Sequence, residues 1–324
     1  MATARVLQVT WLVLAAAATL ALAAAWTPLD VPVWVPTAAS VAVTTLFAYA
    51  LAFRTGGRPW LSGGLGLVLS LVAVLSGLPV LLAGAAVGTA ALGSVLAVMS
   101  TVPAAGYARV VLECLVATAV AAVTALAVHA YGAQVSAERA GYLVLGLSLA
   151  GVLGLVYRLG AGWHGLGRRG ALMLLSGVVL LSVSLAYSEA LARWGSPDVI
   201  ASIDQLARDV RDAAIAVPRP VAVLVGFPAL AWGVSTRARR RQGWWVCAFG
   251  AAAMAVVSSS LVPTRMSLEE AALTIGYSGV LGLLLGYLLV RADAFVTGTR
   301  GRRARRAEEA AAHRPEPGRM QPLL

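Results

Sequence analysis

Uncharged apolar runs of about twenty residues dominate this chain and recur from residue 6 to residue 290. An α-helix rises about 1.5 Å per residue, so roughly twenty apolar residues cross a hydrocarbon layer about 30 Å thick. The composition agrees, because 60% of the 324 residues are hydrophobic, only 12% are charged, and the mean hydropathy is +0.83. Such values are typical of helical membrane proteins. The sequence therefore predicts an all-α, polytopic membrane protein whose main partner is the lipid bilayer.

The apolar runs divide into about ten predicted transmembrane helices. The stretch 61–107 contains no acidic or basic residue and is too long for one crossing, and Ser76-Gly77-Leu78-Pro79 predicts a turn near its middle. The Ala-rich end of the first run resembles a signal-peptide cleavage region, but the run is longer than a usual signal core, which favours a retained helix. The predicted spans are 6–26, 33–53, two within 61–107, 108–131, 141–157, 171–192, 221–234, 244–262 and 271–290.

The basic residues indicate how these spans are oriented. All 25 are arginine, and with ten spans only six of them fall on one side of the membrane, at Arg139, Arg193, Arg208, Arg211, Arg219 and Arg265. Because positively charged loops stay in the cytoplasm, the other side and both termini are predicted to be cytoplasmic. The formal charge of +11 follows from this asymmetry, so no nucleic-acid partner is predicted. The arginine, alanine and glycine bias suggests a bacterial protein, which places it in the plasma (inner) membrane.

Two segments lie outside the predicted spans. Residues 1–292 form one predicted transmembrane domain, and residues 293–324 form a basic, Pro-containing tail that we expect to be disordered because it cannot bury an apolar face. Residues 196–217 predict an extracytoplasmic amphipathic helix, with Ser196 as its cap and apolar residues at alternating spacings of four and three. This helix either lies on the outer leaflet, covers an outward cavity or docks a protein partner.

The chemistry-bearing residues form no recognisable catalytic constellation. With no lysine the chain cannot form a Schiff base. Cys114 and Cys247 lie inside predicted spans and are expected to pack as small apolar residues. The three histidines have no ligand spacing. The sequence therefore predicts no enzyme activity, no metal site and no cofactor.

A few polar residues within or near the predicted spans are candidates for function, since charge is costly in a bilayer. Glu113 lies about one turn into its span, four residues after Arg109, so the two form either a local ion pair or a proton or substrate site. Near the outer ends of two spans, His129, Tyr187 and Glu189 could line an outward vestibule.

Small residues in the last span predict close helix packing. Glycines at spacings of three, three and four form one stripe there, at Gly276, Gly279, Gly282 and Gly286. Two functions remain open. The count of ten spans matches that of small exporters built from two inverted halves, which favours a permease for a small molecule or a lipid-like substrate. The alternative is a non-enzymatic membrane subunit or scaffold of a cell-envelope complex, favoured by the scarcity of polar residues in the spans.

Overall fold

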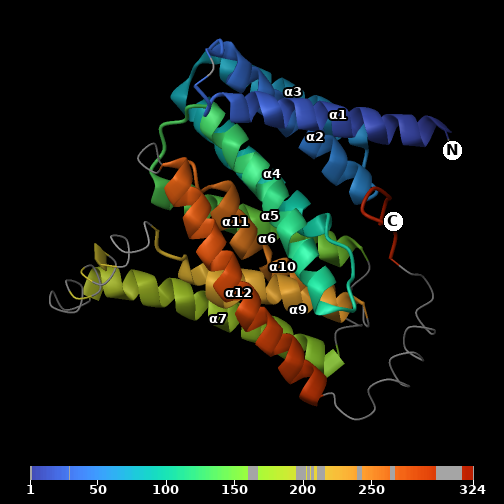
Figure 1. Ribbon diagram of the computed structural model, residues 1–324, viewed down its shortest axis with the longest axis vertical. Helices are drawn as coiled ribbons and strands as arrows, with labels where there is room; N and C mark the ends of the chain where they lie inside the picture. The colour runs from blue at the N-terminus through green and yellow to red at the C-terminus, as the bar shows by residue number, and fades with distance from the viewer. Residues whose placement is uncertain are drawn as a thin grey trace.

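A computed structural model describes residues 2–28, 30–159, 167–194, 202, 205, 208–209, 216–238, 243–262, 267–296 and 316–323. Helices and turns make up this described part of the chain, and it contains no strand. Both termini lie on the same side of the helical bundle, at the right in Figure 1. In chain order the helices are α1 (Ala2–Ala24), α2 (Trp34–Arg54), α3 (Pro59–Ser76), α4 (Pro79–Met99), α5 (Tyr107–Ala130), α6 (Ala137–Arg158), α7 (Gly167–Trp194), the π-helical turn η2 (Ala222–Gly226), α9 (Phe227–Arg237), α10 (Gly243–Phe249), α11 (Ala251–Ser258) and α12 (Leu268–Val296).

The all-helical prediction and the presence of apolar, membrane-length helices are confirmed. Seven helices of the described chain are long and apolar enough to cross a membrane, namely α1 to α6 and α12. Helix also occupies the other three predicted spans, but those stretches are shorter, interrupted or only partly described. Large apolar side chains on the outer helices are exposed, including Leu61, Leu75 and Val80 on α3 and α4. Such exposed apolar faces fit a lipid environment.

The turn between α3 and α4 lies where the sequence predicts it. Helix α3 ends at Ser76, and Gly77 follows it with φ +62°, a left-handed conformation that glycine adopts without steric cost. Pro79 then begins α4, where its missing N–H removes no hydrogen bond. The two helices therefore form a tight hairpin.

Short helices fill the centre of the bundle. Every residue of α10 and nearly every residue of α11 is buried, and both helices pack against the segment formed by η2 and α9. Glycines permit this packing: a Cβ on Gly226 would lie 2.3 Å from the Ala253 nitrogen, and one on Gly233 would lie 2.5 Å from the Cys247 nitrogen. The backbones themselves are therefore in contact, which is the small-residue packing that membrane helices use.

Hydroxyl groups hydrogen-bond across the interior between helices. Thr44 Oγ1 of α2 lies 2.9 Å from Thr89 Oγ1 of α4 and 2.7 Å from the Tyr131 hydroxyl that follows α5. Ser94 Oγ of α4 lies 2.6 Å from Ser258 Oγ of α11. Because both serines are fully buried, Ser258 belongs to the packed core.

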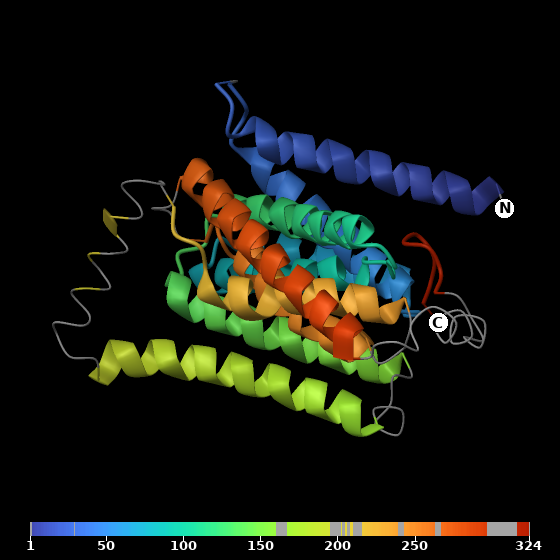
Figure 2. The ribbon, with the colours of Figure 1, turned by 60° about the horizontal axis from the view of Figure 1, so that its bottom comes forward.

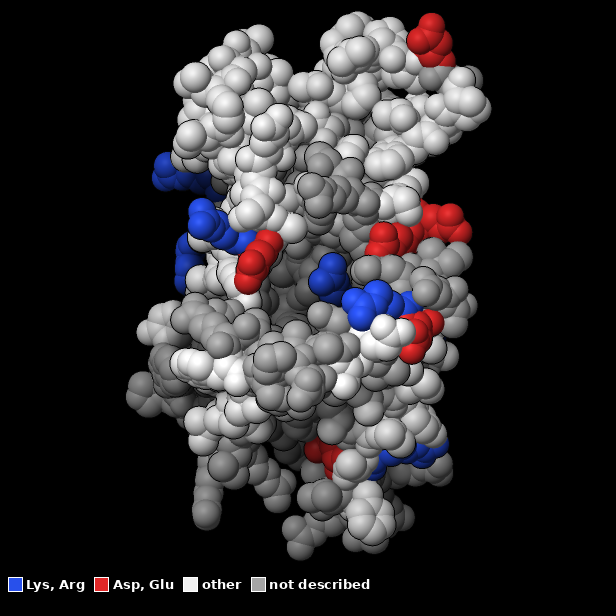
Figure 3. All heavy atoms as spheres, turned by 90° about the vertical axis from the view of Figure 1, so that its left-hand side faces the viewer, with Lys and Arg blue, Asp and Glu red and all other residues white. Residues whose placement is uncertain are grey.

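The two ends of the bundle differ in charge. We call the end that carries Arg54, Glu113 and Arg237 the arginine end, and the opposite end, which carries His129, the histidine end. Figure 3 looks onto the histidine end and shows both acidic and basic side chains on it. The described arginines, by contrast, lie mostly toward the arginine end, at Arg54, Arg58, Arg109, Arg158, Arg237, Arg291 and Arg319.

Candidate functional site

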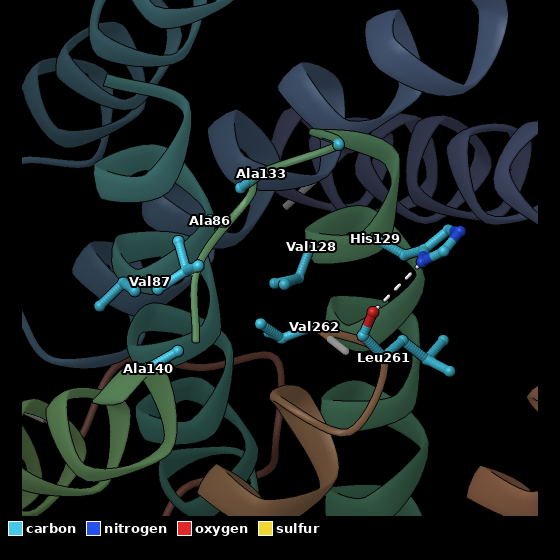
Figure 4. Close-up of a pocket in the computed structure, with 10 residues that line it drawn as sticks. Ala86, Val87, Val128, His129, Ala133, Ala140, Leu261 and Val262 are labelled. Carbon is cyan, nitrogen blue, oxygen red and sulfur yellow. Dashed lines mark hydrogen bonds between the residues drawn. The ribbon is translucent and has the colours of Figure 1, made fainter. Parts of the chain in front are cut away.

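A pocket of about 220 Å³ lies at the histidine end. Alanine and valine side chains form most of its lining, and they come from α4, α5, α6, the loop between α5 and α6, and the segment after α11 (Figure 4). The ring of His129 lies at one edge, where Nδ1 is 3.2 Å from the Leu261 carbonyl oxygen and the ring contacts that of Trp26. The predicted vestibule residue is thus placed at a pocket, but its Nδ1 atom is directed at the Leu261 carbonyl. The pocket is mainly apolar.

The remaining sequence candidates at this end are described only in part. Tyr187 and Glu189 lie on α7, and their side chains are outside the described residues. Most of the predicted amphipathic helix 196–217 is also outside the described residues. Among the few described positions, Gln205 donates a hydrogen bond to Asp209 across 2.8 Å. No described contact joins His129 to the other two candidates.

The glycine stripe of α12 has an uneven set of neighbours. A Cβ on Gly282 would lie 2.6 Å from Phe227 Cβ, and one on Gly286 would lie 2.9 Å from Ala231 Cβ. Gly279 has only ordinary contacts with Phe227, and Gly276 has no neighbour within 4 Å of such an atom. Close approach of α12 to the central helix α9 is therefore concentrated in the second half of the stripe.

The arginine end contains the densest polar cluster of the described chain. Arg54, at the last position of α2, is only 3% exposed. Its Nε donates to the Met99 carbonyl (3.2 Å), and its Nη1 donates to carbonyls of the C-terminal segment, at Gly318 (2.6 Å), Gln321 (2.6 Å) and Pro317 (3.4 Å). All these acceptors are neutral, so the buried cation contacts no carboxylate directly among the described residues.

The C-terminal segment, residues 316–323, lies against this cluster. Its backbone and side chains bond to several elements of the bundle: Leu323 N donates to the Arg54 carbonyl (2.8 Å), and Gln8 Nε2 of α1 donates to the Met320 carbonyl (2.8 Å). The Leu323 side chain packs against the core. The segment has no apolar face of its own, so these contacts depend on the bundle. Residues 297–315 lie outside the described part.

Glu113 binds the C-terminal segment rather than its helical neighbour. Its two carboxylate oxygens accept from Arg319 Nη2 at 2.7 and 2.8 Å, and Oε2 also accepts from Val102 N at 2.8 Å. Arg319 Nε donates to the Ser100 carbonyl at 3.0 Å. Arg109 is exposed, and the described residues include no ion pair between it and Glu113. Glu113 therefore has a longer-range partner in place of Arg109, the local partner that i,i+4 spacing offered.

Arg237, at the end of α9, is held on several sides. Its Nη2 lies 2.5 Å from Glu316 Oε2, and its Nη1 donates to Thr101 Oγ1 at 2.8 Å. The guanidinium carbon lies 3.4 Å from the centroid of the Trp244 ring, a cation–π contact, and Cys247 Sγ accepts weakly from Nη1 at 3.9 Å. With 0% of its side chain exposed, Arg237 is a desolvated cation whose countercharge comes from the C-terminal segment.

The cluster carries an excess of positive charge. Arg54 interacts electrostatically with Arg237, Arg319, Glu113 and Glu316, so three arginines share two carboxylates. Arg54 Nη2 is buried and has no hydrogen-bond partner among the described residues. Buried polar nitrogens are normally bonded, and guanidinium groups bind oxyanions especially well. The arrangement is therefore suited to one further anionic group.

An apolar groove adjoins the cationic cluster. It lies between α1 and the bundle and has a volume of about 280 Å³, close to the lower limit of about 300 Å³ for ligand pockets. Figure 2 shows α1 standing apart from the other helices toward its N-terminus. Trp11 bridges the groove by donating to the Leu46 carbonyl across 3.0 Å. The lining is apolar except at the arginine end, and comprises Leu7, Gln8, Trp11, Leu12, Phe47, Tyr49, Ala50, Phe53, Arg54, Leu96, Ser100, Val120, Arg319 and Met320.

Sequence reasoning identified Glu113 but missed most of this cluster. Arg54 and Arg237 were interpreted as topology signals at span ends, and Glu316 and Arg319 as part of the tail. One signal was available: Glu316 and Arg319 place opposite charges three residues apart in a Pro- and Gly-containing end, away from the arginine-rich run. No family model matches this chain, and comparisons with curated proteins and with solved structures also find no match.

Proposed function

We propose that this chain is a membrane permease that binds a lipid-like amphiphile with an acidic headgroup. The observation that carries the proposal is the continuity between the apolar groove beside α1 and the buried arginines at one end of it. A single acyl or isoprenoid-type chain would bury apolar surface along the groove. The headgroup would then reach Arg54.

The energetics of the groove support an amphiphile over a small polar solute. Apart from its arginine end, the groove offers few polar groups, so a polar solute would lose hydration without replacement. Burying apolar surface contributes about 25 cal/mol per Å², which favours an apolar chain in the same place. Arginine recognises carboxylate and phosphate through paired hydrogen bonds.

The arrangement of the central helices also suits a permease. The π-helical turn η2 and the interruption at Gly250 between α10 and α11 break the regular helix in the middle of the bundle. Interrupted helices at membrane depth are common in transporters, where they form or move around the substrate path. If the arginine end faces the cytoplasm, as its charge predicts, the groove would collect its ligand from the inner leaflet.

Tryptophan fluorescence tests the groove directly. Acidic amphiphiles with a brominated chain quench nearby indoles, and Trp11 lies in the groove. We expect saturable quenching of the Trp11 component, obtained as the difference between the parent protein and Trp11→Phe in detergent. Trp60, which is 75% exposed on α3, gives the matched control through Trp60→Phe.

The Trp11 and Trp60 fluorescence components should respond differently to the brominated amphiphile. An unbrominated acidic amphiphile should restore Trp11 fluorescence, whereas an alcohol of the same chain length should compete poorly because it cannot pair with arginine. Equal, non-saturable quenching of the Trp11 and Trp60 components would show that the amphiphile only partitions into the micelle, and the proposed function would fail.

A further inference from the structure

We infer that the Arg54–Arg237 pair is an oxyanion-binding site, for a carboxylate or phosphate group, and that the C-terminal segment occupies it as a built-in competitor through Glu316. The inference rests on the proposed function insofar as the oxyanion is the amphiphile's headgroup. It adds that the ligand and the chain's own C-terminus exclude each other.

Glu316 is bound in the manner of a ligand. Its carboxylate spans the edge of the Arg237 guanidinium, with Oε1 3.4 Å from Nε and Oε2 2.5 Å from Nη2. This two-point arrangement is the one by which arginine binds free carboxylates and phosphates. The guanidinium is oriented independently of Glu316, by Thr101 and by the Trp244 ring. The binding geometry therefore belongs to the bundle and not to the C-terminal segment.

Arg54 supplies the second half of the site. The segment satisfies its Nη1 only with neutral backbone carbonyls and leaves the buried Nη2 without a partner among the described residues. A buried guanidinium gains more from an anionic acceptor than from neutral ones. An oxyanion that replaced Glu316 could use Nη2 of Arg54 as well, which the C-terminal segment does not do.

The position of the C-terminal segment means that the segment and an anionic headgroup exclude each other. Arg319 and Met320 form the wall of the groove at its arginine end, and Gln8 of α1 holds the Met320 carbonyl. A headgroup that entered from the groove would meet these residues before it reached Arg237. If the segment left without replacement, Arg237 would lose the carboxylate of Glu316, and Glu113 alone would remain to balance Arg54 and Arg237, a costly state. Departure of the segment and entry of an anion should therefore be coupled.

The test compares the full-length protein with Glu316→Gln, using dodecyl phosphate and inorganic phosphate as probes and calorimetry in detergent as the readout. Glu316→Gln removes the competing charge but no part of the bundle. We expect it to bind dodecyl phosphate about tenfold more tightly, the change that one weakened charge-assisted hydrogen bond predicts. Glu316→Asp should restore the parent affinity in part. Glu309→Gln, which removes one negative charge elsewhere in the tail sequence, should leave it unchanged.

Each outcome has a distinct meaning. Tighter binding of both probes in Glu316→Gln would identify a site for free oxyanions, whereas tighter binding of dodecyl phosphate alone would identify a lipid headgroup, and both support the inference. Unchanged or weaker binding in Glu316→Gln would overturn it. The Trp11 quenching signal separates amphiphile binding in the groove from competition by Glu316. Saturable quenching that is the same with and without the Glu316 carboxylate would leave the proposed function intact and refute the competition. Loss of saturable quenching in every variant would refute the proposed function itself.

Discussion

Glu113→Gln should release the C-terminal segment from the bundle. In the native protein both oxygens of this nearly buried carboxylate accept from Arg319 Nη2, at 2.7 and 2.8 Å. Hydrogen bonds to charged groups contribute about 1.5–3 kcal/mol, and breaking a buried ion pair costs about 3–5 kcal/mol. The glutamine keeps one acceptor and 32% of the Arg319 side chain is exposed, so we take the cost as about 2 kcal/mol. The ratio of released to docked segment should then rise about 30-fold.

Thiol labelling measures this ratio. A Leu323→Cys background places a thiol where the segment packs against the core, and the native Cys114 and Cys247 are buried. When opening is fast, labelling follows the population of the released form, so the maleimide rate should rise about 30-fold in Glu113→Gln. Glu138→Gln, an exposed carboxylate at the histidine end, is the matched control.

The reasoning is refuted by a specific result. If the labelling rate in Glu113→Gln equals that of the Glu138→Gln control, Glu113 does not hold the segment. An equal loss of thermal stability in the two variants, together with unequal labelling, would show that the effect is local to the segment.

Three further predictions concern packing and the groove. Gly226→Ala should lower the free energy of unfolding by about 2 kcal/mol, because its Cβ would lie 2.3 Å from a backbone atom. Gly84→Ala, which has open space around it, should raise the free energy of unfolding by about 0.5–1 kcal/mol. Thermal melts in detergent compare the two variants. Ser94→Ala removes the 2.6 Å bond between the Ser94 and Ser258 hydroxyls and should cost about 1 kcal/mol in the same melts. Ala50→Trp fills the groove and should weaken dodecyl phosphate binding about tenfold or more in calorimetry, with unchanged helix content by circular dichroism.

Helix positions were predictable because their signal is local. Twenty apolar residues in succession, a Gly-Leu-Pro turn at 77–79, and arginines at span ends each act within a few residues of where they occur. The tightest helix contacts were harder to predict. Gly226 and Gly233 touch backbone, but they lie seven residues apart and do not show the shorter spacing of four that marks small-residue packing. The more regular stripe of α12 includes Gly276, around which a Cβ would have no neighbour within 4 Å.

The candidate site was only partly predictable because its pairings are long-range. Glu113 and Arg319 are 206 residues apart, and Arg237 and Glu316 are 79 apart, so no local rule links them. The i,i+4 rule pointed instead to Arg109. The position of residues 316–323 has the same origin, since that segment bonds to α1, α2, α5 and α9, all of which are far from it in the sequence.

Photo-crosslinking with an acidic amphiphile that carries a diazirine on its chain tests the central claim most directly. Adducts mapped by mass spectrometry should fall on the groove, at residues such as Leu12 and Phe47, and should disappear when unlabelled dodecyl phosphate is added. Adducts spread over the exposed α3 face, at residues such as Leu65 and Val68, with none in the groove and no competition, would contradict the account.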